Sequence, residues 1–345
     1  MQRTISQLNM SSTIRNILFI FGIVCVVIMV LHFDADGRGA SMFLSSVWPW
    51  MPIVLAIWIP IYAFNALAYK TIVNLTAPTS ASPRIKYVEA ARLTISGFAF
   101  SYITPMGFGG LPYRIMELRQ RLGTTRATAS TLLYSMTHVL SHFLLWSTAA
   151  ILFPVFYSGK MNMTLWLLIG CFLLLAVIVF FVFLKGIRSK IALKLLTLFT
   201  LIPFIKRFTQ HWLLKYSEKA QQIDQSLSML HRAPLLFLKA LACEYIARLI
   251  NTWEFILILA AFGHHIAYVD ALMILAFSSL IGNIFFFLPL QLGAREGGVI
   301  SIISLLSLPA VVGVYTAFFT RIREIFWVAI GVILIKFHPK TDNND

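Results

Sequence analysis

The amino-acid sequence predicts an all-α integral membrane protein with about seven transmembrane helices and two re-entrant hairpins rich in proline and glycine. Three observations predict this fold class. Of the 345 residues, 59% are hydrophobic and 12% are charged, whereas a soluble domain has about 25% charged residues. The mean hydropathy is +0.82. Apolar stretches of about 20 residues, the length that crosses a bilayer, recur along the chain.

Windows of that length predict the spans in order. They lie near residues 14–31, 47–69, 127–156, 164–184, 233–262, 268–288 and 309–335. No small-residue cleavage site follows the first span, so we interpret it as an uncleaved anchor rather than a signal peptide. Two further apolar stretches, near 93–111 and 293–308, are shorter or broken by glycine and proline. We expect one polytopic membrane domain over residues 1–345.

The formal net charge is +15, and its distribution points to a membrane rather than to a nucleic acid. Lysine and arginine concentrate in residues 70–126 and 185–232. The positive-inside rule therefore predicts an inner or plasma membrane protein with the N-terminus and both basic segments in the cytoplasm. Apolar residues at helical spacing in 185–232 predict an amphipathic helix on the anionic inner leaflet. A solvated basic loop that only sets the topology is the alternative.

Residues 104–146 and 288–327 follow one pattern. Each begins with a proline and glycines, continues with an arginine and a glutamate, and ends in a span where a tyrosine and a tryptophan stand twelve residues apart. These landmarks are Pro105, Tyr134 and Trp146 in the first segment and Pro289, Tyr315 and Trp327 in the second. The pattern predicts a weak internal repeat, with units at about 47–156 and 268–335. Chance similarity between two amphiphilic segments is the alternative.

The proline and glycine residues of both segments break the helical backbone, and broken backbone cannot face lipid because its polar groups would lack partners. We therefore predict two re-entrant hairpins that enter from the cytoplasmic side and turn back. An inverted arrangement, in which one hairpin crosses fully, is the alternative.

Charged residues in these segments need a partner or a role, because an ionisable residue at membrane depth costs roughly 2.5–3.5 kcal/mol on insertion scales. We expect Arg114 and Glu117, three residues apart, to pair, and Arg295 and Glu296 are neighbours at a bend. An arginine beside backbone N–H groups freed by glycine suits a phosphate or carboxylate headgroup. Alternatively, each arginine–glutamate pair only locks its hairpin.

Polar residues on the later helices complete a predicted headgroup cavity. Glu244, Arg248 and Asn251 share one helix face, with Glu254 at its edge, and an ion pair between Glu244 and Arg248 is expected. The full set of predicted cavity residues is Gly109, Gly110, Tyr113, Arg114, Glu117, Glu244, Arg248, Asn251, Gly293, Arg295, Glu296, Arg321, Arg323 and Glu324. His138 and His142 are read as hydrogen-bonding partners between helices or as a polar relay. No catalytic residue or cofactor is predicted. No metal site is predicted either, because the three cysteines lie far apart in apolar spans.

The stretches "TPMGFGGLPYRIMELRQRLG" and "FLPLQLGAREGG" resemble the transmembrane region of the lysylphosphatidylglycerol synthase family. Pro105, Gly109, Gly110 and Arg114 match its first motif, and Pro289, Gly293, Arg295 and Glu296 match its second. The resemblance covers roughly residues 14–335. The second turn of the family usually reads Pro-Gly-Gly-hydrophobic-Gly, where this chain has "PLQLG".

The resemblance implies a flippase-like function, the movement of a phospholipid or polyprenyl-linked lipid between leaflets. Lysyl-transferring members of the family carry a large soluble catalytic domain after the membrane part, and this sequence stops at Asp345. We therefore expect a stand-alone membrane part that is not an enzyme. One alternative is a non-transporting partner or anchor of a separate lipid-modifying enzyme. Another is a membrane-embedded lipid-modifying enzyme that uses Glu244, Glu254 or Glu296. Membrane lipids are the expected partners, and a homodimer stays open.

Overall fold

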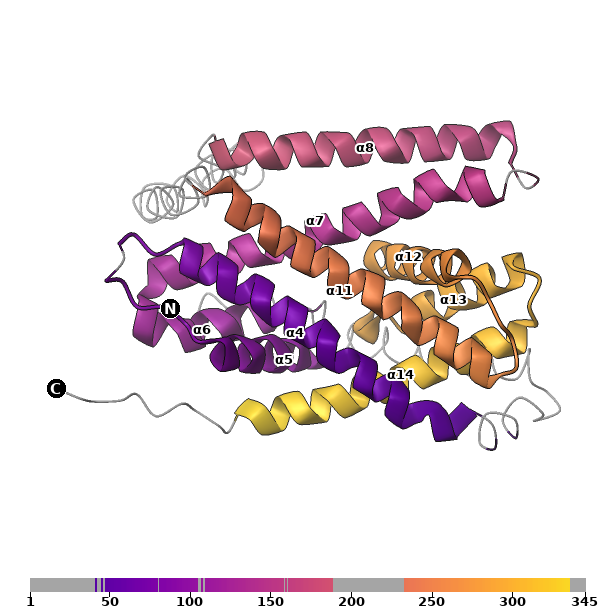
Figure 1. Ribbon diagram of the computed structural model, residues 1–345, viewed down its shortest axis with the longest axis horizontal. Helices are drawn as coiled ribbons and strands as arrows, with labels where there is room; N and C mark the ends of the chain where they lie inside the picture. Colours follow the sequence, from indigo (N-terminus) through magenta and orange to yellow (C-terminus); the bar gives the residue numbers. More distant parts are fainter. Residues whose placement is uncertain are drawn as a thin grey trace, which may run out of the picture. The chain divides into compact units, whose positions relative to one another are not determined.

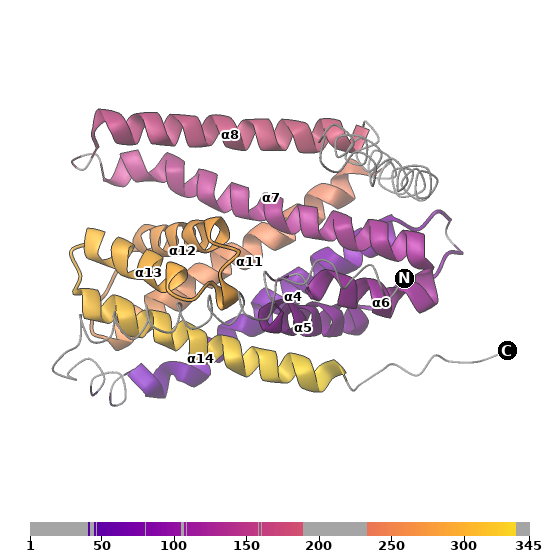
Figure 2. The same cartoon turned by 180° about the vertical axis from the view of Figure 1, so that it is seen from behind.

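The computed structural model describes residues 41, 45, 47–79, 81–104, 107, 109–157, 159, 161–188 and 233–335. This part of the chain is built of helices and contains no strand, so the all-α prediction is confirmed (Figures 1 and 2). The predicted span near 14–31 and residues 189–232 of the basic segment lie outside the described residues. Predictions that rest on them stay predictions.

The described α-helices are α4 (Met51–Leu75), α5 (Tyr87–Ile103), α6 (Gly110–Leu122), α7 (Thr124–Phe156), α8 (Met163–Arg188), α11 (Pro234–Ala261), α12 (Tyr268–Ile284), α13 (Ala294–Leu305) and α14 (Ala310–Ile335). Short 3-10 helices occur at Trp48–Trp50 and Pro289–Gln291. Gly123, whose φ of 78° is in the left-handed region, separates α6 from α7. A residue without a Cβ atom adopts this conformation at little cost, which explains why the two helices are separated at a glycine.

Three helical segments among the described residues are long and apolar enough to cross a membrane. They are Trp48–Leu75, Thr124–Phe156 and Met163–Phe183. α11 and α14 have 28 and 26 residues, but several charged residues interrupt each of them. α12 has 17 residues, fewer than the roughly 20 that span a bilayer. The membrane character is therefore confirmed, and the total of seven spans stays a prediction.

The chain forms two compact units. Unit 1 draws its described residues from Met1–Ile61, Ile95–Gly110 and Leu249–His338, and unit 2 from Tyr62–Thr94 and Leu111–Arg248. Helices α4, α5 and α11 each continue from one unit into the other. These units differ from the two repeat-like segments that the sequence suggests.

In unit 1, α12, α13 and α14 pack closely through glycine, and α12 and α13 lie side by side in both views (Figures 1 and 2). A methyl group built on Gly298 of α13 would lie 3.2 Å from the Cα atom of Ser278 on α12. One built on Gly313 of α14 would lie 2.9 Å from the Cα atom of Ile300 on α13. Small residues of this kind allow membrane helices to approach backbone to backbone.

In unit 2, α5 and α6 run antiparallel, because ion pairs join early residues of one to late residues of the other. Arg92 pairs with Glu117 and Glu89 pairs with Arg121, each at 2.7 Å. The segments α5–α6–α7 and α12–α13–α14 share an order of elements, since a 17-residue helix, a turn and a helix of 13 or 12 residues precede the long helix. The internal repeat and the re-entry of either hairpin into the membrane stay predictions.

Unit 2 also contains α7 and α8, which lie side by side in both views (Figures 1 and 2). The apolar window of α8 is 6% buried within the protein. Such an apolar and uncovered helix is suited to direct contact with lipid tails.

Candidate functional site

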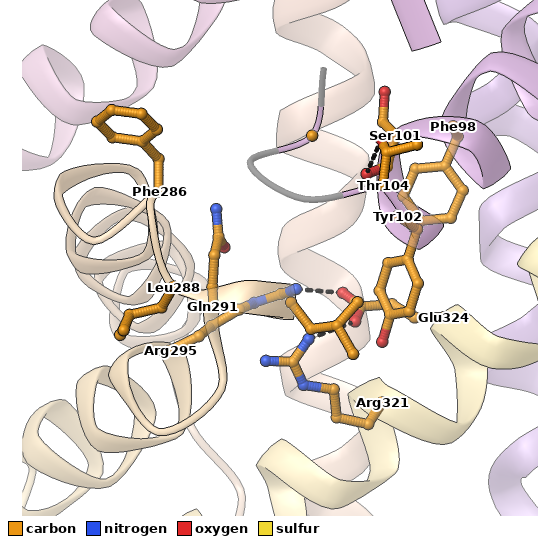
Figure 3. Close-up of a pocket in the computed structure, with 12 residues that line it drawn as sticks. Phe98, Ser101, Tyr102, Thr104, Phe286, Leu288, Gln291, Arg295, Arg321 and Glu324 are labelled. Carbon is orange, nitrogen blue, oxygen red and sulfur yellow. Dashed lines mark hydrogen bonds and ion pairs between the residues drawn. The ribbon is translucent and has the colours of Figure 1, made fainter. Parts of the chain in front are cut away.

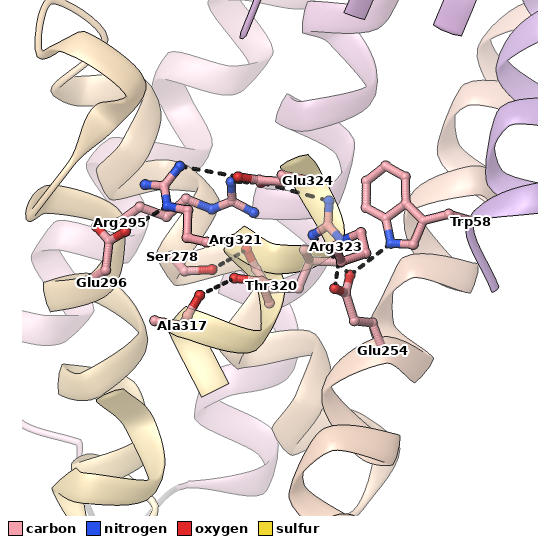
Figure 4. Close-up of polar contacts among 11 residues, drawn as sticks. Trp58, Glu254, Ser278, Arg295, Glu296, Ala317, Thr320, Arg321, Arg323 and Glu324 are labelled. Carbon is pink, nitrogen blue, oxygen red and sulfur yellow. Dashed lines mark hydrogen bonds and ion pairs between the residues drawn. The ribbon is translucent and has the colours of Figure 1, made fainter. Parts of the chain in front are cut away.

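Six charged side chains from three helices of unit 1 meet in one network, which we call the arginine–glutamate cluster (Figure 4). Its members are Glu254 of α11, Arg295 and Glu296 of α13, and Arg321, Arg323 and Glu324 of α14. Three positive and three negative charges cancel. The α14 members lie near the middle of that helix, where an unpaired charge in a membrane is most costly.

The most buried part of the cluster joins Arg323 to Glu254. The Nε and Nη2 atoms of Arg323 donate to the two carboxylate oxygens of Glu254 at 2.9 and 3.3 Å, and both side chains are 1% exposed. The indole N–H of Trp58 donates to Glu254 at 3.1 Å. The guanidinium also lies 3.9 Å from the ring centroid of Trp58. Two-point hydrogen bonding and a cation–π contact fix this arginine firmly.

Glu324 is the centre of the cluster. Its carboxylate accepts hydrogen bonds from Arg295 and, at 3.1 Å, from the Nη1 atom of Arg321. The Nη1 atom of Arg323 lies 3.7 Å from it. Three cations therefore surround one carboxylate that is 4% exposed.

Glu296 links the cluster to the turn before α13. One carboxylate oxygen accepts from the Nε atom of Arg321 at 2.7 Å, and the other accepts from the backbone N–H of Gly293 at 2.8 Å. The second bond caps the N-terminus of α13. Arg295 and Glu296, neighbours in sequence, thus reach different residues of α14. Successive residues of a helix do not face each other, so Arg295 and Glu296 do not form an ion pair that would lock the hairpin.

The turn between α12 and α13 contains left-handed backbone at residues other than glycine. Leu290 and Gln291 have φ angles of 56° and 54°, and Gly293 has a φ of 81°. This conformation costs about 1–2 kcal/mol for each residue with a Cβ atom. Leu290 and Gln291 occupy the two positions where the family that the sequence resembles usually has glycine. The two residues that differ from the family pattern are therefore the ones with strained backbone. Such strain is often found at functional sites.

A pocket of about 220 Å³ lies within unit 1, between the end of α5, the turn after α12, and α14 (Figure 3). Its lining residues are Phe98, Ser101, Tyr102, Thr104, Gly107, Phe286, Leu288, Leu290, Gln291, Arg295, Arg321 and Glu324. Figure 3 shows Arg295 and Arg321 converging on Glu324, with Tyr102 beside that carboxylate. One wall of the pocket is therefore formed by the arginine–glutamate cluster.

Arginine N–H groups at this wall are not all used by the protein. The Nη2 atom of Arg321 is buried and has no hydrogen-bond partner among the described residues. The side chain of Arg295 is 25% exposed. Guanidinium groups bind phosphate and carboxylate oxygens with matched geometry. The wall is therefore chemically suited to a small anionic group.

The arginine of the first Pro/Gly turn has different surroundings, within unit 2. The guanidinium of Arg114 lies 5.5 and 5.2 Å from the ring centroids of Tyr69 and Tyr134. It donates hydrogen bonds to the backbone carbonyls of Leu93 at 3.2 Å and Thr94 at 3.4 Å. Aromatic faces and carbonyl oxygens, both neutral, hold this cation.

The expected pairing of Glu117 with Arg114 is wrong, because Glu117 forms its ion pair with Arg92 at 2.7 Å. The antiparallel packing of α6 on α5 brings Arg92 opposite Glu117. The predicted cavity residues Gly109 and Gly110 serve the turn itself. The N–H of Gly109 donates to the Thr104 hydroxyl at 2.7 Å, and neither glycine lines the pocket.

The predicted ion pair between Glu244 and Arg248 is replaced by hydrogen bonds that both residues form with α7, within unit 2. Glu244 accepts its hydrogen bond from the Nδ1 atom of His138 at 2.7 Å, and the carboxylate is 1% exposed. Arg248 donates to the Ser141 hydroxyl at 2.7 Å and to the His138 carbonyl at 3.1 Å. The ring of His142 lies edge-on to that of His138, with centroids 5.4 Å apart. A polar relay through these histidines stays a prediction.

The predicted cavity residues therefore fall into two groups. Unit 1 holds Gly109, Gly110, Asn251, Gly293, Arg295, Glu296, Arg321, Arg323 and Glu324, and unit 2 holds Tyr113, Arg114, Glu117, Glu244 and Arg248. The two relay candidates, His138 and His142, also belong to unit 2. The Oδ1 atom of Asn251 is buried without a partner among the described residues. Tyr113 is buried.

Sequence reasoning missed Trp58, Tyr102 and Gln291 as contributors to the cluster or the pocket. Tyr102 stands in the polar run "SYIT" directly before Pro105, which was a usable signal. Trp58 lies in an apolar span and gave none. Within the residues that the structure describes, no three His, Cys, Asp or Glu side chains gather as metal ligands. The expected lack of a metal and of a cofactor stays a prediction.

Comparison with known proteins gives one finding. Searches of the curated proteins and of the solved structures returned no match. The family model described as "Lysylphosphatidylglycerol synthase TM region" matches residues 16–331, nearly the whole chain, and includes both Pro/Gly turns and the arginine–glutamate cluster. The chain therefore belongs to the family of the lysylphosphatidylglycerol synthase transmembrane region.

Proposed function

We propose that this membrane protein moves a phospholipid or polyprenyl-linked lipid between the two leaflets, and that the pocket of unit 1 receives the lipid headgroup. Family membership supports a role that involves membrane lipids. The volume of about 220 Å³ is below the roughly 300–1,000 Å³ of pockets that enclose whole drug-sized ligands. It suits a headgroup whose acyl or prenyl chains stay in the bilayer.

The observation that carries the proposal is the unused hydrogen-bonding capacity of Arg321. Its Nη2 atom has no acceptor among the described residues, and a buried donor without an acceptor costs about 1–3 kcal/mol. Arg321 lines the pocket, and a small shift of its side chain would bring this buried N–H group to a phosphate oxygen there. Glu296 and Glu324 hold the guanidinium in place at 2.7 and 3.1 Å. A donor fixed before binding loses little conformational freedom when the headgroup arrives.

A non-enzymatic role is part of the proposal. Among the candidate acids and bases of unit 1, Glu254 is bound at both oxygens by Arg323 and Trp58. Glu296 is bound at both oxygens by Arg321 and the N–H of Gly293. Carboxylate oxygens that are already engaged by fixed protein donors are poorly placed to exchange a proton with a substrate, as general acid or base catalysis requires.

We further propose a location in the inner or plasma membrane, with the N-terminus in the cytoplasm. Contact of the basic segment with the anionic inner leaflet belongs to the same proposal. A homodimer and a separate lipid-modifying enzyme as partner stay predictions.

The test is lipid translocation in reconstituted vesicles that contain tail-labelled phosphatidylglycerol, phosphatidylethanolamine or polyprenyl phosphate. The wild-type protein is expected to move at least one of them faster than protein-free vesicles do. Arg295→Ala should lower that rate about tenfold or more, because a hydrogen bond to a charged group contributes about 1.5–3 kcal/mol. Glu324 keeps Arg321 as an ion-pair partner in this variant, so the fold should persist.

Arg119→Ala is the matched control, because it removes an equal charge at an exposed position of α6. Thermal unfolding in detergent checks that both variants are folded. Background rates with all three lipids, or equal rates for Arg295→Ala and Arg119→Ala, would contradict the proposal.

A further inference from the structure

The strained turn between α12 and α13 places one polar side chain at the pocket. Leu290 and Gln291 are consecutive left-handed residues, with φ angles of 56° and 54°. Both line the pocket. In Figure 3 the carboxamide of Gln291 extends from the turn into the space between Phe286 and Arg295. Glycine would adopt this backbone conformation freely. The chain instead has Gln291 there, whose carboxamide carries one acceptor and two donors.

Gly282 of α12 makes room for this carboxamide. A methyl group at Gly282 would lie 2.8 Å from the Oε1 atom of Gln291 and 3.4 Å from its Cδ atom. The side chain therefore packs over a position that has no Cβ atom. No hydrogen bond is formed by the carboxamide within the described part of the chain, so its donors and acceptor remain available to a ligand.

The charges around Gln291 limit what this ligand is. Arg295 and Arg321 line the same pocket as Glu324, and that carboxylate is already occupied by both arginines. A headgroup with an ammonium group would meet two guanidinium groups and no free carboxylate. A phosphodiester beside the arginines and neutral hydroxyl groups beside the carboxamide fit the wall instead.

We propose that Gln291 is a specificity-determining residue that selects phosphodiester lipids whose headgroups carry hydroxyl groups and no amine. The inference rests on the proposed function, since it takes the pocket for a headgroup site. The two arginines bind the phosphate. The carboxamide of Gln291 exchanges hydrogen bonds with the hydroxyls, and the left-handed turn holds it there.

A binding experiment isolates the contribution of the hydroxyl groups. Short-chain phosphatidylglycerol and phosphatidylmethanol carry the same single negative charge, and only the first has headgroup hydroxyls. Dissociation constants come from thermal-shift titrations of the purified protein in detergent. The wild type is expected to bind the glycerol lipid about two- to tenfold more tightly, the range of one neutral hydrogen bond.

Three substitutions at Gln291 sharpen the test. Gln291→Ala and Gln291→Gly should bring the two lipids to equal affinity. Gln291→Glu should shift the preference toward short-chain phosphatidylethanolamine, because a carboxylate attracts its ammonium group. Ser307→Gly is the control, since Ser307 is also left-handed, with a φ of 64°, and does not line the pocket. It relieves similar backbone strain and should keep the wild-type ratio.

Equal affinity of the wild type for phosphatidylglycerol and phosphatidylmethanol would overturn the inference, as would an unchanged ratio in Gln291→Ala. Vesicle translocation separates this result from the proposed function. Selective binding that depends on Gln291, without any lipid movement, would support the specificity role and contradict transport. Movement of phosphatidylglycerol with an unchanged binding ratio in Gln291→Ala would support transport and overturn the role of Gln291.

Discussion

The two Pro/Gly turns carry the same kinds of residue, but their arginines are held in opposite ways. Arg295, after the second turn, pairs with the carboxylate of Glu324. Arg114, after the first, has no ion pair among the described residues and is held by two tyrosine rings and two backbone carbonyls. The motif thus determines the position of the arginine, and the residues of the neighbouring helices determine whether a carboxylate balances its charge. The charge of Arg295 is balanced by a neighbouring carboxylate, whereas that of Arg114 is held by neutral groups.

The largest effect that tests this contrast is expected at the buried pair of unit 1. Glu254→Gln leaves Arg323 without its closest anion and should lower the free energy of unfolding by about 3–5 kcal/mol. In unit 2, Glu89→Gln removes a partner of Arg121, whose side chain is 41% exposed, and should cost about 0.2–1 kcal/mol. Reversible unfolding in detergent measures both. Similar losses in the two variants would mean that the cluster is hydrated rather than buried.

Two glycines in helices beside the turns, Gly110 of α6 and Gly282 of α12, give the next effect. A methyl group on Gly110 would lie 2.4 Å from the backbone oxygen of Gly97, which cannot move aside. One on Gly282 would meet the flexible end of Gln291. Gly110→Ala should therefore destabilise the protein by about 1–3 kcal/mol, and Gly282→Ala by less. Thermal unfolding of the two variants in parallel measures the difference, and a greater loss for Gly282→Ala would contradict this account of the turns.

The smallest effect concerns the aromatic support of Arg114. A double-mutant cycle between Arg114→Leu and Tyr134→Leu should give a coupling free energy of about 0.5–1 kcal/mol, the usual size of a cation–π contact. The control cycle combines Arg119→Leu with Tyr134→Leu, and the changes in unfolding free energy are expected to be additive in that cycle. If the cycle at Arg114 is additive as well, the Tyr134 ring does not support this arginine, and Tyr69 and the two carbonyl groups hold it.

Most helix positions could be predicted because hydropathy is a property of consecutive residues. The span predicted at 127–156 is Thr124–Phe156 in the structure, and the one predicted at 309–335 is Ala310–Ile335. The span predicted at 268–288 ends earlier, at Ile284. Its last residues, still apolar, form the turn that leads to Pro289, so composition alone could not locate the end.

The charged members of the site could also be predicted, because an ionisable residue in an apolar helix needs a partner. The partners themselves could not. Arg295 stands next to Glu296 in sequence but pairs with Glu324, and Glu117 pairs with Arg92. These choices depend on how helices face one another. Gln291 was noticed as a departure from the family pattern, but its left-handed backbone and its place in the pocket required coordinates.

Glu324 has three cations around it, two of which it shares with Glu296 and Glu254, and under the proposed function this sharing bears on how a headgroup can enter and leave. When an anion draws Arg295 away, the carboxylate still has Arg321 at 3.1 Å and Arg323 at 3.7 Å. No acidic group is stranded in the membrane interior, so the large penalty of a lone buried charge does not arise at that step. Under the proposed function, Arg295 would be shared between a resident carboxylate and a transient phosphate, so that partner exchange leaves Glu324 with a cation beside it.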